Sequence, residues 1–209
     1  MATSAVRSND RILLKALELF SEKGYDATSV REICEAAGIT KPTLYHFYGS
    51  KEGVYRAIVE GSLERFRADM IFALSGEGSL RDQLVRMARG YVDATVRQPD
   101  LARFLMALIH NPPHSAPTTD FVGFYQGILD ALARAVDEAV ARGEVCPGPT
   151  DIRLLVFMGA LGEAMHGHLL VGRPDLTPAL ADTLVDTVLG GWTLALDTPS
   201  ERAVAPSPP

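Results

Sequence analysis

The sequence predicts an all-α fold, with a small N-terminal group of three helices followed by a larger helical domain. The 209 residues are 47% hydrophobic, which is enough for an ordinary packed core. Apolar residues recur three and four positions apart along nearly the whole chain, and no stretch keeps the alternation typical of a strand. Clusters of Gly, Pro and Ser divide this pattern into segments of helical length.

The first two predicted helices each carry one apolar face and end at a glycine. The first covers residues 10–22 and stops before Gly24, since glycine tolerates the conformation that ends a helix. Ser29 and, three residues later, Glu32 form a capping box, a reciprocal pair of hydrogen bonds that opens a helix. The second helix therefore begins at Ser29 and ends near Gly38.

The next two helices begin at hydroxyl residues suited to capping. Thr40 opens a short helix that runs to about Phe47. Pro42 falls in its first turn, where a missing N–H breaks no hydrogen bond. Ser50 opens a longer helix over residues 51–74.

The remaining pattern predicts five more helices and a tail. The helices lie near residues 80–97, 100–110, 118–142, 150–171 and 177–197. The last residues are rich in Pro and Ser, which is typical of disorder. We therefore expect an N-terminal domain over residues 1–56, a larger domain over 57–197 and a disordered tail over 198–209.

Charge and cysteine content narrow the classes of protein that fit. The net charge of −6 argues against a protein that coats nucleic acid indiscriminately, because such binding neutralises phosphates. Residues 1–56 carry a net charge of +1 and residues 57–209 carry −7, so we expect any nucleic-acid contact in the first part. Cys34 and Cys146 are far apart and form neither a disulfide framework nor a metal-ligand pair.

The chain shows no sign of membrane insertion or export. The longest apolar stretches, such as Leu101–Ile109, fall short of the ~20 residues that span a bilayer. The N-terminus lacks the apolar core of a secretory signal. We therefore expect a cytoplasmic protein without a membrane partner.

The second and third helices, joined by residues 37–39, have the spacing of a helix-turn-helix, whose second helix lies in the DNA major groove. Spacing alone is a weak signal, but the composition of the third helix strengthens it. Leu44 and Phe47 are expected to face the core, which leaves hydroxyl, basic and aromatic groups, Tyr48 among them, outside. Such groups contact phosphates and base edges, and a lysine in the first turn of the following helix would clamp a phosphate there. The residues predicted to bind DNA are Thr40, Lys41, Thr43, Tyr45, His46 and Lys51.

The run Arg11–Val59 resembles the DNA-binding domain of the TetR family of transcriptional regulators. The resemblance rests above all on residues 37–47, AGITKPTLYHF, and on the Lys-Glu pair at 51–52. The earlier FSEKGY and TSV segments agree with it. About a quarter of the chain is covered.

This resemblance implies a function for both parts of the chain. The helix over residues 41–47 would be the recognition helix, and the six predicted residues would contact mostly the DNA backbone. Pro42 stands where many relatives have Gly, so the bases read there stay open, as does the role of Tyr48. The partners implied are a palindromic double-stranded operator with half-sites one helical turn (~34 Å) apart, a second copy of the chain, and a small-molecule effector whose binding releases a repressor from DNA.

The last two long helices are the candidates for the homodimer interface. They combine large apolar residues with glycines, and a glycine inside a helix costs up to ~1 kcal/mol unless close packing requires it. The same residues could instead pack within one subunit. The candidates are Leu155, Gly159, Gly162, Leu184, Val188, Gly191 and Trp192.

Bulky side chains of the larger domain are candidates for lining an effector cavity, although such residues are more often plain core than ligand contacts. Their composition favours an apolar or amphipathic effector over a strongly anionic one, and two histidines could anchor a head group. We expect neither a metal nor a cofactor, because the histidines lack the spacing of helical ligand pairs. The candidates are Met70, Met87, Tyr91, Phe104, Leu108, His110, Phe121, Phe124, Tyr125, Met158 and His166.

Two other classes of protein fit the sequence less well. An enzyme is disfavoured because the sequence contains no P-loop, GxGxxG, GxSxG or HExxH motif. A helical ligand- or protein-binding module would lack salt-sensitive binding to specific DNA. Neither class explains residues 40–51.

Overall fold

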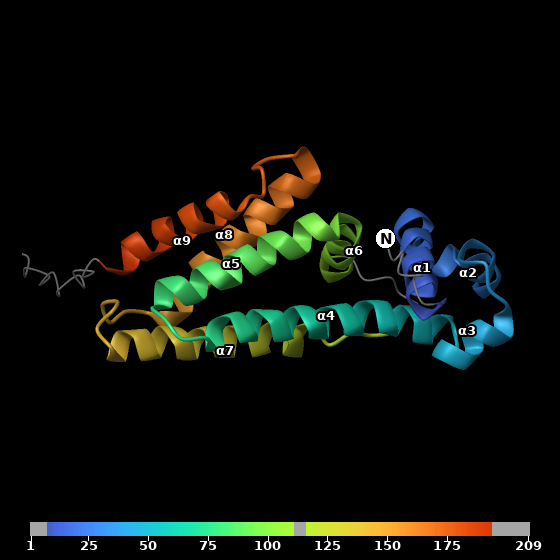
Figure 1. Ribbon diagram of the computed structural model, residues 1–209, viewed down its shortest axis with the longest axis horizontal. Helices are drawn as coiled ribbons and strands as arrows, with labels where there is room; N and C mark the ends of the chain where they lie inside the picture. Colours follow the sequence, from blue (N-terminus) through green and yellow to red (C-terminus); the bar gives the residue numbers. More distant parts are fainter. Residues whose placement is uncertain (1–7, 111–115, 194–209) are drawn as a thin grey trace, which may run out of the picture.

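The computed structural model describes residues 8–110 and 116–193, and every regular element in that part is an α-helix (Figure 1). The predicted all-α fold class is therefore confirmed. The prediction for the tail lies outside the described residues, and the last helix ends at Trp192 rather than near residue 197. The helices are α1 (Ser8–Ala27), α2 (Val30–Ala37), α3 (Lys41–Tyr48), α4 (Lys51–Ser75), α5 (Leu80–Arg97), α6 (Pro99–His110), α7 (Phe121–Ala141), α8 (Thr150–Val171) and α9 (Pro178–Trp192).

Two helix ends differ from the prediction for local reasons. α1 extends to Ala27 because helical geometry resumes after Gly24, which has φ 83° and ψ 167°. The predicted stop is thus a kink. α7 begins at Phe121 rather than near residue 118, because the Asp120 side chain caps it and accepts a hydrogen bond from the Gly123 N–H at 2.8 Å.

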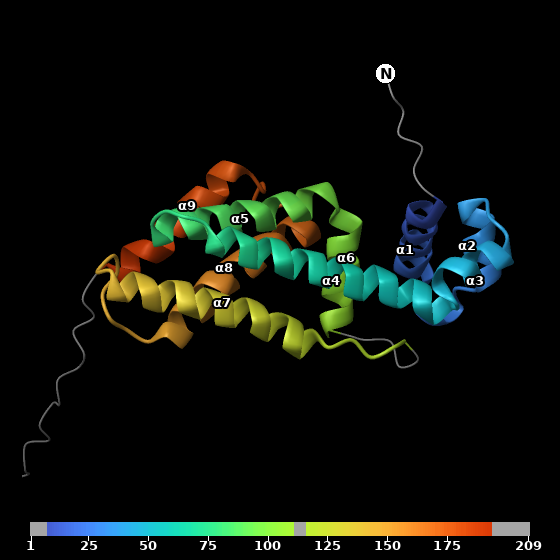
Figure 2. The same ribbon diagram turned by 60° about the horizontal axis from the view of Figure 1, so that its bottom comes forward.

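The molecule is elongated, with α1, α2 and α3 grouped at one end (Figures 1 and 2). α4 leaves this group and runs alongside the larger domain; its 25 residues span about 37 Å. In that domain α5 packs against α4, α7, α8 and α9. α6 lies across the junction, between the first helices and the larger domain.

The buried side chains form two hydrophobic clusters. The first cluster joins α1, α2, α3 and the first half of α4 with Phe104 and Leu108 of α6. The second cluster joins the rest of α4 with α5, α7, α8 and α9. Leu63 belongs to the first cluster and Met70 to the second, so the two clusters meet within the continuous helix α4. The domain boundary expected after residue 56 lies in the same helix.

Candidate nucleic-acid interface and ligand groove

The turn between α2 and α3 has the geometry of a helix-turn-helix. Gly38 ends α2 with φ 61° and ψ 43°, a left-handed conformation that favours glycine, and its N–H points at the carbonyl oxygens of Cys34 and Glu35. Thr40 caps α3, because its hydroxyl accepts a hydrogen bond from the Thr43 N–H at 3.4 Å. The caps predicted for α2 and α3 are both present.

Leu44 and Tyr48 hold α3 against the rest of the first domain. Leu44 is fully buried, and the half-buried Tyr48 donates its hydroxyl to the carbonyl oxygen of Asn9 at 3.0 Å. Four residues apart, these two side chains share one face of the helix. Phe47 therefore lies outside and is 48% exposed, so its predicted core position is wrong and Tyr48 occupies that position instead.

The outer side of α3 presents polar and aromatic groups to solvent. Tyr45 is 48% exposed, and no described residue pairs with its hydroxyl. The ring of His46 meets the ring of Phe47 edge-on, with centroids 5.3 Å apart. Phe47 was not predicted as a surface residue, because Phe47 and Tyr48 lie three and four residues from Leu44 and the spacing does not decide between them. The predicted DNA-contact residues that reach this outer side are Thr40, Lys41, Thr43, Tyr45 and His46.

Lys51 is arranged differently from the outward phosphate clamp that was predicted. Its Nζ donates to the carbonyl oxygens of Tyr25 at 2.8 Å and Thr28 at 2.9 Å. It also lies 4.1 Å from the centroid of the Tyr25 ring, within range of a cation–π contact. Since two of its three N–H donors are used inside the domain, Lys51 holds the α1–α2 loop against the start of α4.

Other contacts hold the same loop. The Thr28 hydroxyl donates to the carbonyl oxygen of Gly24 at 2.8 Å. Lys23 forms an ion pair with Glu32, whose carboxylate also closes the capping box with Ser29. The hydrogen bonds from Lys23 and then from Ser29 lower the pKa of Glu32 to about 2. The cap of α2 therefore stays ionised at neutral pH.

A Lys51→Met variant is expected to lower the free energy of unfolding by about 1.5–3 kcal/mol, because it removes a charged donor from two carbonyl oxygens but keeps the apolar stem. Urea denaturation of the full chain measures this change. Lys15→Met is the matched control, since Glu18 on the surface of α1 is the one described residue that Lys15 pairs with, and it should stay within about 0.5 kcal/mol of the parent. Equal stability of the two variants would contradict the role given to Lys51.

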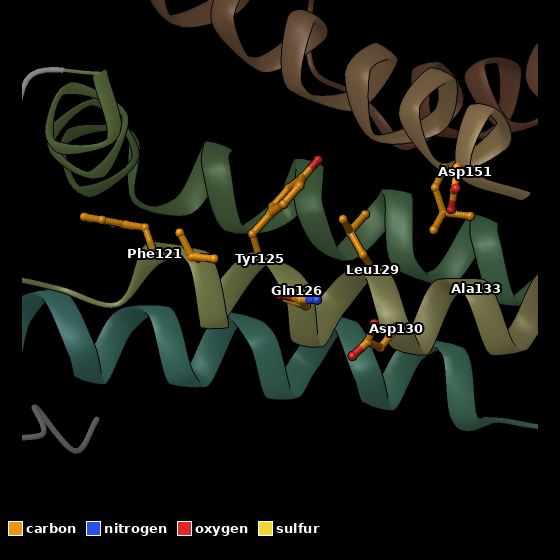
Figure 3. A pocket seen from close by; sticks show the side chains of 9 residues that line it. Phe121, Tyr125, Gln126, Leu129, Asp130, Ala133 and Asp151 are labelled. Carbon is orange, nitrogen blue, oxygen red and sulfur yellow. The ribbon is translucent and has the colours of Figure 1, made fainter.

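A groove of about 500 Å³ lies over the outer side of α7 and is bounded by the start of α8. Figure 3 shows Tyr125 and Leu129 rising from α7 on the side of α8. Two of the predicted ligand residues, Phe121 and Tyr125, are in its lining. The lining consists of Phe121, Val122, Tyr125, Gln126, Leu129, Asp130, Ala133, Asp151 and Leu154.

Two more predicted ligand residues adjoin this groove. Tyr91 of α5 and Phe124 of α7 both pack against Phe66, with ring centroids 5.4 Å and 6.3 Å from it. Burial raises the pKa of Tyr91 to about 12, and the nearby Tyr125 adds to the shift. The structure thus brings together Tyr91, Phe121, Phe124 and Tyr125, with a neutral phenol beside the groove.

Two of the predicted ligand residues belong to a different part of the molecule. Phe104 and Leu108 are buried in the first cluster, where the Phe104 ring stacks 6.5 Å from Phe20 and meets Tyr55 edge-on at 6.2 Å. Neither side chain lines the groove over α7, so their place in an effector cavity stays a prediction. α6 directs them toward the helix-turn-helix domain instead.

The remaining ligand candidates with described side chains do not line the groove either. Met70, Met87 and Met158 are buried in the second cluster. His166 is half-buried on α8. The side chain of His110 lies outside the described part of the structure.

The predicted dimer residues divide into an exposed and a buried set. Leu155 is 66% exposed, and an added Cβ at Gly159, Gly162 or Gly191 would meet only open space. In contrast, Val188 and Trp192 are buried in the chain's own second cluster, and Leu184 packs against it. The predictions for Val188 and Trp192 are corrected, because these side chains are already covered within one chain, whereas the half-buried Leu184 stays a candidate.

α8 is unusually apolar for a helix with so much exposed surface. Its most apolar 18 residues have a mean hydropathy of 1.5, and 28% of them are buried. By length and composition alone it could cross a membrane, although no membrane-spanning segment was predicted from the sequence. Its packing against α7 and α9 makes it part of the helical domain. Its exposed apolar residues include Ile152, Leu155 and Val156.

Comparison with known proteins identifies relatives of both domains. Residues 12–58 match the family described as "Bacterial regulatory proteins, tetR family", and residues 74–188 match the "Tetracyclin repressor-like, C-terminal domain". The chain is 42% identical over 175 residues to the HTH-type transcriptional regulator UidR of Escherichia coli (strain K12), a match that covers 81% of this chain and 83% of UidR.

Two solved structures have the same fold. One is the TetR family transcriptional regulator PfmR from Thermus thermophilus, with a TM-score of 0.68, 24% identity, and coverage of 87% of this chain and 98% of PfmR. The other is the transcriptional regulator FadR from Bacillus subtilis in complex with stearoyl-CoA, with a TM-score of 0.68, 17% identity, and coverage of 87% of this chain and 97% of FadR.

Proposed function

Because this chain belongs to the TetR family of bacterial regulatory proteins, and is therefore a helix-turn-helix transcriptional regulator, we propose that it represses transcription from a palindromic operator until a small ligand releases it. The observation that carries the proposal is the outer side of α3, where Lys41, Tyr45 and His46 are suited to DNA and have no structural task. We place the protein in the bacterial cytoplasm, where its operator is, and assign it no catalytic role.

The outer side of α3 is suited to the major groove. Lys41, Tyr45 and His46 make no hydrogen bond or ion pair with another described residue, so their donors are available to phosphates and base edges. Thr40 and Thr43 share a hydrogen bond of 2.9 Å at the N-terminal end of the helix, the end that meets base edges in helix-turn-helix proteins. Lys51 is proposed to act indirectly, by holding the α1–α2 loop against the start of α4.

A second copy of the chain is proposed to cover the exposed apolar side of α8. A two-fold dimer presents two recognition helices to the two halves of a palindrome. Burying Leu155 and its apolar neighbours would remove from water the surface that makes α8 so hydropathic. Gly159 and Gly162 leave room for the close approach of a partner helix.

A Leu155→Arg variant is expected to raise the dimer dissociation constant by on the order of a hundredfold, because a two-fold interface buries the substituted residue twice. Sedimentation equilibrium measures the constant, and operator binding should weaken in parallel. Phe72→Arg is the control, since Phe72 is 79% exposed on α4, and it should leave the dimer intact. A Leu155→Arg protein that dimerises as tightly as the parent would place the interface elsewhere.

The ligand is proposed to act through the groove over α7. Phe121 lines this groove and also packs against the first cluster, and Phe124 packs against both clusters. A ligand that moves either ring would change the packing of α6 on the helix-turn-helix domain. Release from DNA requires only that the ligand bind one arrangement of the two recognition helices more tightly than the other.

A further inference from the structure

The groove over α7 is polarised along its length. Figure 3 shows Phe121 at one end and, at the other, Ala133 with Asp151 above it. The twelve residue-to-residue steps from Phe121 to Ala133 rise about 18 Å along the helix. The first end is apolar and aromatic, since it is formed by Phe121, Val122 and Tyr125.

The second end of the groove is acidic. Asp130 lies on the flank of α7 and Asp151 in the first turn of α8, and both are exposed. Neither carboxylate forms an ion pair or a hydrogen bond with another described residue, and no Lys or Arg is among the nine residues that line the groove. By contrast, Asp182 and Asp186 on α9 are each paired with an arginine of α5.

We propose that this groove takes a single-chain amphiphile with a cationic head group, an inference that rests on the proposed function of the groove as the effector site. The alkyl chain lies along the apolar end, where it covers Phe121 and Tyr125. The head group lies at the acidic end, where Asp130 and Asp151 supply the opposite charge. An anionic amphiphile of the same length meets two carboxylates there and no Lys or Arg among the residues that line the groove.

Isothermal titration of the full-length protein, without DNA, tests this preference. The probes are dodecyltrimethylammonium, dodecyl maltoside and dodecyl sulfate, each below its micellar concentration, so that the alkyl chain stays constant and the head group changes. Dodecyltrimethylammonium is expected to bind about fivefold to tenfold more tightly than the neutral probe, the gain from two exposed charge pairs. Dodecyl sulfate is expected to bind more weakly than both.

The double variant Asp130→Asn/Asp151→Asn is expected to lose this fivefold to tenfold advantage and to bind the neutral probe within about twofold of the parent. Asp69→Asn is the matched control, because Asp69 is an exposed aspartate on α4 away from the groove. Circular dichroism checks the fold of each variant. If the double variant is unfolded, the single Asp130→Asn change within α7 takes its place and should lose about half of the advantage on a logarithmic scale.

The proposal is overturned if the cationic probe binds no better than the neutral one, if dodecyl sulfate binds most tightly, or if Asp69→Asn loses as much as the double variant. A separate titration of the operator complex distinguishes this inference from the function on which it rests. Release of DNA by the neutral or anionic probe alone would overturn the charge preference and keep the effector groove. Tight binding of the cationic probe without any release of DNA would overturn the role of the groove as the effector site and keep the charge preference.

Discussion

Replacing Tyr45 with alanine is expected to weaken binding of the dimer to its operator by on the order of a hundredfold. The Tyr45 hydroxyl lies on the outer side of α3, has no partner among the described residues, and is placed to donate to a phosphate. A hydrogen bond to a charged group contributes about 1.5 kcal/mol or more, and a two-fold dimer loses two of them. The loss should appear in DNA affinity and not in stability, because Tyr45 is half-exposed and belongs to neither hydrophobic cluster.

Fluorescence anisotropy with a labelled operator, at several salt concentrations, measures this effect. Tyr45→Phe should lose nearly as much affinity as Tyr45→Ala, since the hydroxyl and not the ring makes the contact. Phe72→Ala, which removes an exposed ring on α4, is the control and should bind DNA within about twofold of the parent. A folded Tyr45→Ala protein with parental affinity would remove α3 from the interface.

A Phe104→Ala variant is expected to lower the free energy of unfolding by about 3–5 kcal/mol and to weaken the link between ligand binding and DNA release. The Phe104 ring is buried against Phe20 of α1 and Tyr55 of α4, so its removal opens a cavity where α6 meets the helix-turn-helix domain. Without this packing, a movement of α6 no longer repositions the recognition helix.

Phe157→Ala is the matched control for Phe104→Ala. Phe157 is fully buried in the second cluster, so its loss should cost a similar 3–5 kcal/mol while the contact of α6 with the first domain stays intact. Urea denaturation measures stability, and the ratio of operator affinities with and without ligand measures the link. If the larger change is too destabilising, Phe104→Leu keeps most of the volume and should show the same loss of coupling in weaker form. Equal coupling in the Phe104 and Phe157 variants would exclude α6 as the connection.

The helices and their caps could be predicted from the sequence because they depend on residues only three or four positions apart. Ser29 with Glu32, and Thr40 with the Thr43 N–H, are local pairs that the structure confirms. The register of α3 could not be predicted in the same way. In a helix of eight residues, either Phe47 or Tyr48 can share a face with Leu44, and a hydrogen bond to Asn9, 39 residues away, decides between them.

Partners distant in the sequence also decide where the other site residues lie. The apolar pattern of α6 indicates that Phe104 and Leu108 are buried, but it does not say against which helices. Lys51 has the spacing of a phosphate clamp, yet the carbonyl oxygens of Tyr25 and Thr28 turn its charge inward. Trp192 is apolar enough for a dimer interface, but it is covered within its own chain.

The most direct test of the central claim is selection of bound sequences from random duplex DNA with the purified full-length protein, with Tyr45→Ala in parallel. A dimeric operator-binding repressor should enrich a palindrome whose half-sites lie about one helical turn apart, and the variant should enrich it far less. Absence of any enriched motif at low salt would contradict the account and leave a helical binding module without sequence-specific DNA recognition.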